Sequence, residues 1–75
     1  MKKAIILFID DEIVLASKIK QILELEDYFV QYESSAIIAL DYLKENIPDL
    51  IICDIWPYHS YYISQVALHH TIIHF

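Results

Sequence analysis

Short apolar runs alternate along the chain with longer stretches in which apolar positions recur every three or four residues. Residues 4–9 and residues 50–53 form uninterrupted apolar runs that are rich in isoleucine. Runs of this kind are typical of strands that are buried on both faces of a parallel sheet. Residues 29–32 alternate between apolar and polar side chains and predict a short strand between the other two.

Two helices are predicted between these strands. The first runs from residue 12 to about residue 26, with Asp11 as its N-cap and Asp27 at its end, where glycine would be usual. Its predicted buried face is Leu15, Ile19, Ile22 and Leu23, and its predicted solvent face is Lys18, Lys20, Gln21 and Glu24. The second helix, residues 36–45, follows the capping pair Ser34-Ser35 and is expected to bury Ala36, Ala39, Leu40 and Leu43.

The alternation of strands and helices predicts right-handed βαβ units and an α/β fold. We expect a flavodoxin-like, doubly wound parallel sheet with strand order 2-1-3 that is incomplete in this chain. The pattern weakens after Pro57. Residues 62–68 predict a partial third helix, and residues 71–75 predict the first half of a fourth strand.

Length and composition limit the possibilities further. The chain has 75 residues, of which 57% are hydrophobic, so it holds at most one small domain, and that domain has an apolar core. Glycine is absent. Turns that need a positive φ angle must therefore be made by Asn, Asp or Ser.

The net charge of the chain and its distribution limit which classes of molecule it can bind. The net charge is −6, and all five lysines and eleven acidic residues lie within residues 1–54, which excludes a basic surface for nucleic acid. The uncharged residues 55–75 contain Pro57 and several polar side chains, so we expect no membrane span. The single cysteine, Cys53, gives no disulfide and fits a cytoplasmic location, and we expect it to be a buried strand residue.

Three carboxylates follow the two isoleucine-rich runs. Asp10 and Asp11 come directly after the first run, and Asp54 comes directly after the second. Ligands of open α/β sheets bind at the carboxyl ends of the strands, so the three side chains should meet at one edge. Carboxylates gathered in this way repel one another unless a cation lies between them, and oxygen ligands suit Mg²⁺. The simpler alternative is that Asp10 and Asp11 only cap the helix and that Asp54 only makes a turn.

Two stretches, ILFIDDE at residues 6–12 and PDLIICDIWP at residues 48–57, resemble the receiver domain of two-component response regulators. The resemblance covers residues 3–57. It implies that Asp54 accepts a phosphoryl group from a histidine kinase and that the domain is not an enzyme in its own right. It also implies that Mg²⁺ is bound by Asp11 directly, by Asp10 through water, by Asp54, and by the backbone carbonyl of Trp56.

The sequence departs from the receiver pattern after Asp54. Pro57 comes three residues later instead of four, no glycine follows, and the family's switch hydroxyl and lysine would lie beyond residue 75. We therefore expect residues 1–75 to be a truncated receiver with a degenerate tail at residues 58–75 and impaired signalling. The alternative is a degenerate remnant or interaction fragment without phosphorylation. In both cases residues 50–53 would form a poorly covered sheet edge that favours self-association.

Overall fold

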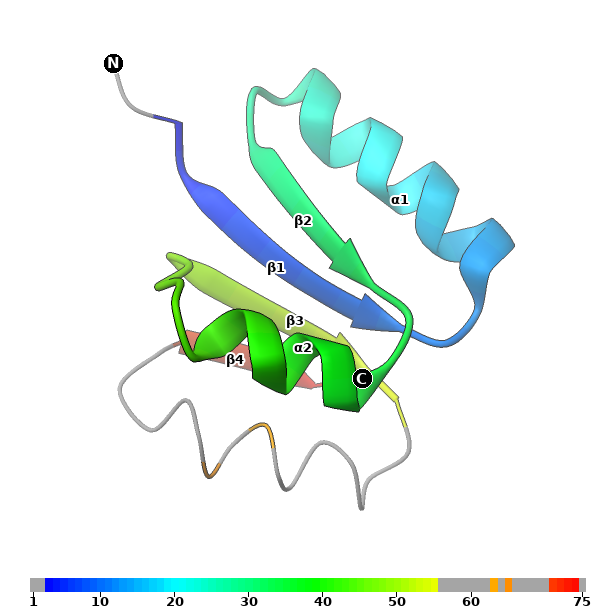
Figure 1. Cartoon of the computed structure of the whole chain (residues 1–75). Coiled ribbons are helices and arrows are strands. Elements are labelled where there is room, and N and C mark those ends of the chain that lie inside the picture. The colour runs from blue at the N-terminus through cyan, green and yellow to red at the C-terminus, as the bar shows by residue number, and fades with distance from the viewer. Residues whose placement is uncertain (1–2, 56–62, 64, 66–70, 75) are drawn as a thin grey trace.

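The computed structural model describes residues 3–55, 63, 65 and 71–74. Within them lie strands β1 (Ile5–Asp10), β2 (Phe29–Glu33), β3 (Leu50–Asp54) and β4 (Thr71–His74), and helices α1 (Ile13–Leu25) and α2 (Ala36–Leu43). All strand pairings are parallel, and the strand order is β2-β1-β3-β4 (Figure 1). The predicted strands and both predicted helices are therefore confirmed, as is the strand order 2-1-3.

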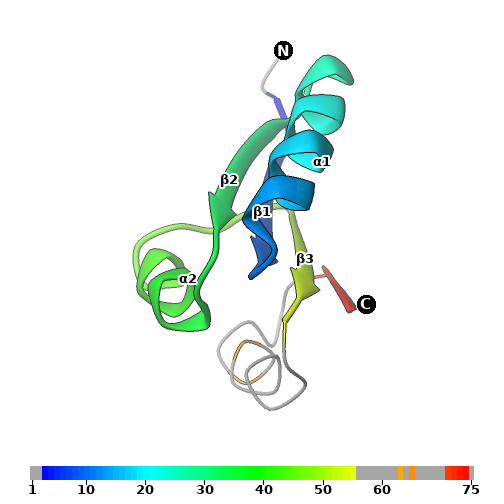
Figure 2. The same ribbon diagram turned by 90° about the vertical axis from the view of Figure 1, so that its right-hand side faces the viewer.

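The two helices lie on opposite faces of the sheet (Figure 2). Right-handed βαβ crossovers place helices on both faces of a parallel sheet when the direction across the sheet reverses, as it does here between the β1–β2 and β2–β3 connections. The fold is thus α/β and compatible with a flavodoxin-like architecture. Most of the third helix predicted at residues 62–68 falls outside the described residues, although Ile63 and Gln65 are both helical.

The larger part of the core lies on the α2 face of the sheet. Successive strand residues point to opposite faces, so Leu7 and Ile9 of β1 meet Ile51 and Cys53 of β3 on this side. Ala39 and Ile63 complete this buried cluster. On the α1 face the buried cluster is smaller and consists of Phe8, Ala16 and Val30.

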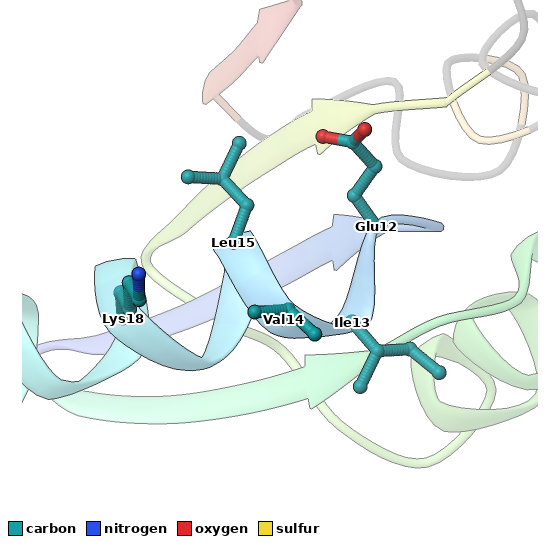
Figure 3. A pocket seen from close by; sticks show the side chains of 5 residues that line it. All are labelled: Glu12, Ile13, Val14, Leu15 and Lys18. Atoms are coloured by element: carbon teal, nitrogen blue, oxygen red, sulfur yellow. The ribbon is translucent and has the colours of Figure 1, made fainter.

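Helix α1 is rotated relative to the sequence prediction. Ala16 is fully buried, and Ile19 and Leu23 pack with it against the sheet. Leu15 and Ile22, which were predicted to be buried, are 46% and 60% exposed. The small side chain of Ala16 lets the helix approach the sheet, and residues three and seven positions later share its side of the helix. Leu15 and Ile13 extend from different sides of the first turn (Figure 3).

The ends of the helices differ in how they are fixed. Glu12, not Asp11, is the N-cap of α1, and its side chain makes no capping bond. The predicted N-cap role of Asp11 is therefore wrong. The second helix begins as predicted, because the Ser35 side chain accepts a hydrogen bond from the Ile37 N–H. Asp27 follows α1 and has a φ angle of 69°, in the left-handed region. Glycine usually takes this conformation at the end of a helix, and Asp27 takes it here, at the helix end where the sequence analysis placed it.

The expectation that β3 forms a poorly covered sheet edge is wrong. Strand β4 pairs with β3 through four residues, so β3 is an inner strand, and the outer strands of the described sheet are β2 and β4. Asp49 directly precedes β3. Its carboxylate accepts a hydrogen bond of 2.7 Å from the Ile5 N–H, and its own N–H donates to the Ile5 carbonyl, so it fastens the start of β3 to β1.

Candidate functional site

Asp10 and Asp54 end two neighbouring parallel strands. They are partners in the register of β1 and β3, and neighbouring strands lie about 4.8 Å apart. Both side chains line the same cavity, so they also share a face of the sheet. The structure thus brings together these two predicted site residues at the carboxyl edge, as the sequence led us to expect.

Asp10 is held in place and almost entirely shielded from water. Its side chain is 1% exposed, and its Oδ1 accepts a hydrogen bond of 2.8 Å from the Glu12 N–H. Its Oδ2 is buried without a hydrogen-bond partner among the described residues. Burial raises the pKa of Asp10 above its usual value, and the Glu12 N–H opposes this shift. The charges of Asp54 and Asp11 raise the pKa of Asp10 further.

The other predicted ligands are placed differently. Asp11 is exposed and Asp54 is partly exposed. In the described part of the chain, no three His, Cys, Asp or Glu side chains are gathered closely enough to hold a metal ion. The carbonyl of Trp56 lies outside the described residues. The structure therefore pairs Asp10 with Asp54 but does not gather the full predicted ligand set.

The donor set nevertheless fits a hard cation. A buried carboxylate oxygen without a hydrogen-bond partner lacks the compensation that buried polar atoms usually have. A divalent cation would provide that compensation, and Mg²⁺ is usually bound by one or two carboxylates with several water molecules. Asp10 and Asp54 would supply these carboxylates, and Asp11 is exposed at the next position after Asp10.

Sequence reasoning missed one residue beside the site. The Tyr32 hydroxyl donates a hydrogen bond of 2.6 Å to the Asp10 backbone carbonyl, which ties the end of β2 to the end of β1. Burial raises the pKa of Tyr32, and the negative charges of Asp10, Asp11 and Glu33 raise it further. Its ring also packs against Phe8, with centroids 5.8 Å apart. The position of Tyr32 at the carboxyl end of a predicted strand was a usable clue.

A cavity of about 160 Å³ opens beside the two carboxylates. It lies between α1 and the sheet, and its lining residues are Phe8, Asp10, Ile19, Leu23, Ile52 and Asp54. Its walls are therefore apolar except where Asp10 and Asp54 meet. A separate hollow, lined by Glu12, Ile13, Val14, Leu15 and Lys18, lies on the first turns of α1 (Figure 3).

Cys53 lies next to the site in sequence but points to the other face of the sheet. It is a buried free thiol, as predicted, and burial together with the charge of Asp54 raises its pKa to about 11. Since the thiolate is the reactive form, we expect iodoacetamide at mildly alkaline pH to alkylate the native chain at least about a hundredfold more slowly than the urea-unfolded chain. Mass spectrometry over time measures both rates. Equal rates would contradict the buried position.

Comparison with known proteins does not assign the chain to a family. No protein-family model matches the sequence, and no curated protein matches it either. Within the described residues, no helix combines the length and apolar character that crossing a membrane requires.

Proposed function

We propose that the chain is the phosphoacceptor part of a receiver module, in which Asp54 takes a phosphoryl group from a phosphohistidine of a cytoplasmic sensor kinase. The observation that supports this proposal most strongly is the pairing of Asp10 and Asp54 across β1 and β3, with one buried carboxylate oxygen that lacks a partner. Mg²⁺ would be bound by Asp10, Asp11 and Asp54, and by the Trp56 carbonyl.

The two paired carboxylates are suited to different roles. Asp54 is partly exposed, so an incoming phosphoryl group can reach its oxygens. Asp10 is buried and oriented by the Glu12 N–H, so it is fixed as a ligand and unsuited to attack. Tyr32 fixes the Asp10 backbone from the other side. This division of roles favours Asp54 as the nucleophile.

The reaction forms one bond and breaks one bond. An Asp54 carboxylate oxygen bonds to phosphorus as the phosphorus–nitrogen bond of the donor breaks, and the released imidazole takes up a proton. A Mg²⁺ ion held by these carboxylates would neutralise negative charge on the phosphoryl oxygens. The remaining task for the protein is positioning, which the strand register and the hydrogen bonds around Asp10 provide.

A second function is favoured by the exposed apolar side chains. Those exposed by 60% or more are Ile13, Val14, Ile22, Leu25, Ile37 and Ile47, on both helices and the loop after α2. Contiguous exposed apolar area is typical of a surface that binds another protein, and Ile13, Val14 and Leu15 line one hollow on the first turns of α1. A chain that serves only as an interaction module would keep this surface and take no phosphate.

Labelling by a small phosphodonor separates the two functions. With radiolabelled acetyl phosphate and Mg²⁺, we expect slow incorporation that EDTA abolishes, because the metal is needed to offset the charge of the phosphoryl oxygens. Asp54→Asn should abolish incorporation. The control Asp41→Asn, which removes an exposed carboxylate on α2, should leave it unchanged. Label that survives Asp54→Asn would contradict the proposal, and no label at all would favour the interaction module.

A further inference from the structure

The cavity beside the carboxylates has an apolar wall and an acidic end, and a metal ion would need only the acidic end. Most of its wall is apolar and is formed by Phe8, Ile19, Leu23 and Ile52. Its volume of about 160 Å³ is close to that of an engineered apolar cavity of about 150 Å³ that binds benzene. The space is therefore sufficient for one small apolar ring.

One end of this cavity is acidic. The buried Asp10 Oδ2 has no hydrogen-bond partner among the described residues, and Asp54 lies beside it in register. An occupant that offers only an apolar surface would leave that oxygen without a donor. A hydrated metal ion would satisfy the oxygen but would gain nothing from the apolar wall.

We propose that this cavity binds a small primary ammonium ion whose carbon skeleton is about the size of a benzene ring. An ammonium group carries three N–H donors and a positive charge, so it can donate to the Asp10 Oδ2 and to Asp54 at once. The ring would lie between α1 and the sheet, against Leu23 and Ile52.

This inference uses the same two carboxylates as the proposed function, but it requires neither phosphorylation nor Mg²⁺. Because the ammonium and the metal need the same oxygens, each should weaken the binding of the other. An organic amine in the cavity would therefore inhibit labelling of Asp54 by competing with Mg²⁺.

Benzylammonium chloride is a suitable probe of the 75-residue chain, with benzyl alcohol as the neutral compound of matched size. We expect benzylammonium, in the absence of Mg²⁺, to shift the methyl NMR signals of Ile19, Leu23 and Ile52 in a saturable way. We expect benzyl alcohol to bind at least about tenfold more weakly, because it lacks the charge. Added Mg²⁺ should displace the amine.

Two substitutions test the two ends of the cavity. Asp10→Asn removes the charge but keeps the shape, and Leu23→Phe fills the apolar space, so each should weaken benzylammonium binding at least about tenfold. Asp41→Asn should have no effect. The methyl spectrum of each variant shows whether it is folded, and Mg²⁺ binding by Leu23→Phe shows whether the acidic end is intact.

Equal affinities for benzylammonium and benzyl alcohol would overturn the inference, as would binding that survives both substitutions. Neither result would affect the proposed phosphorylation, which Leu23→Phe should retain. Conversely, an amine site in a chain that takes no phosphate would leave this inference standing and refute the proposed function.

Discussion

Replacing Ile51 with alanine should reduce the free energy of unfolding by about 2–5 kcal/mol. Ile51 is fully buried on the α2 face of the sheet, where β3 runs between β1 and β4. A chain of this length has a total stability of only about 4–11 kcal/mol. The substitution should therefore remove a large share of the stability and lower the urea concentration at the unfolding midpoint, which urea denaturation followed by circular dichroism measures.

The chain provides a matched control for this prediction. Ile47→Ala removes the same atoms from a side chain that is 81% exposed. Its effect on the free energy of unfolding should stay within about 0.5 kcal/mol. Similar losses from the two substitutions would show that β3 is not an inner strand of the sheet.

Replacing Asp10 with asparagine should stabilise the chain near neutral pH by about 1–3 kcal/mol. The amide keeps an oxygen that can accept from the Glu12 N–H, and it removes a buried negative charge that faces Asp54. The amide nitrogen takes the place of the oxygen without a partner, and a neutral amide costs less to bury than a charged carboxylate. Urea denaturation of both proteins measures the difference.

The same substitution should change how stability depends on pH. The pKa of Asp10 is raised in the folded chain, chiefly by burial. The folded state therefore binds the Asp10 proton more tightly than the unfolded state, and this contribution to stability is lost as the pH rises through the folded pKa. The advantage of Asp10→Asn should accordingly be largest near neutral pH and should shrink as the pH falls below that pKa. An advantage that grows on acidification would contradict the assigned cause.

Magnesium should stabilise the unchanged chain more than it stabilises Asp10→Asn. A ligand that binds only the folded state stabilises it, so Mg²⁺ should raise the stability of the unchanged chain. It should have much less effect on Asp10→Asn, which lacks one of the paired carboxylates. Asp41→Asn should behave like the unchanged chain. Asp49 would be unsuitable as a control, because its carboxylate accepts a hydrogen bond from the Ile5 N–H.

The order and type of the elements could be predicted from the sequence, because uninterrupted isoleucine-rich runs leave little alternative to buried parallel strands. The rotation of α1 about its axis could not be predicted from the sequence. Apolar residues occur on every side of this helix, including Ile13, Val14 and Leu25, so its pattern does not single out one face. The deciding residue was Ala16, which is small enough to allow close contact with the sheet but too small to stand out in an apolar pattern.

The candidate site was predictable to the extent that strand topology determines it. Asp10 and Asp54 meet because β1 and β3 are parallel neighbours, and their order along the chain was enough to predict this. The bond between Tyr32 and the Asp10 carbonyl depends on how far β2 extends beside β1, which the sequence pattern did not define. The position of Asp11 outside the buried pair depends on the turn into α1, where Asp10 accepts the bond from Glu12.

The most direct test of the account is to find which carboxylate carries the phosphoryl group after reaction with acetyl phosphate and Mg²⁺. Borohydride reduces an aspartyl phosphate to homoserine, so peptide mass spectrometry can locate the modified residue. The account predicts homoserine at position 54 alone, with no modification at Asp10, because Asp10 is buried and Asp54 is accessible. Homoserine at position 10 or 11, or none at position 54 in a labelled chain, would contradict it.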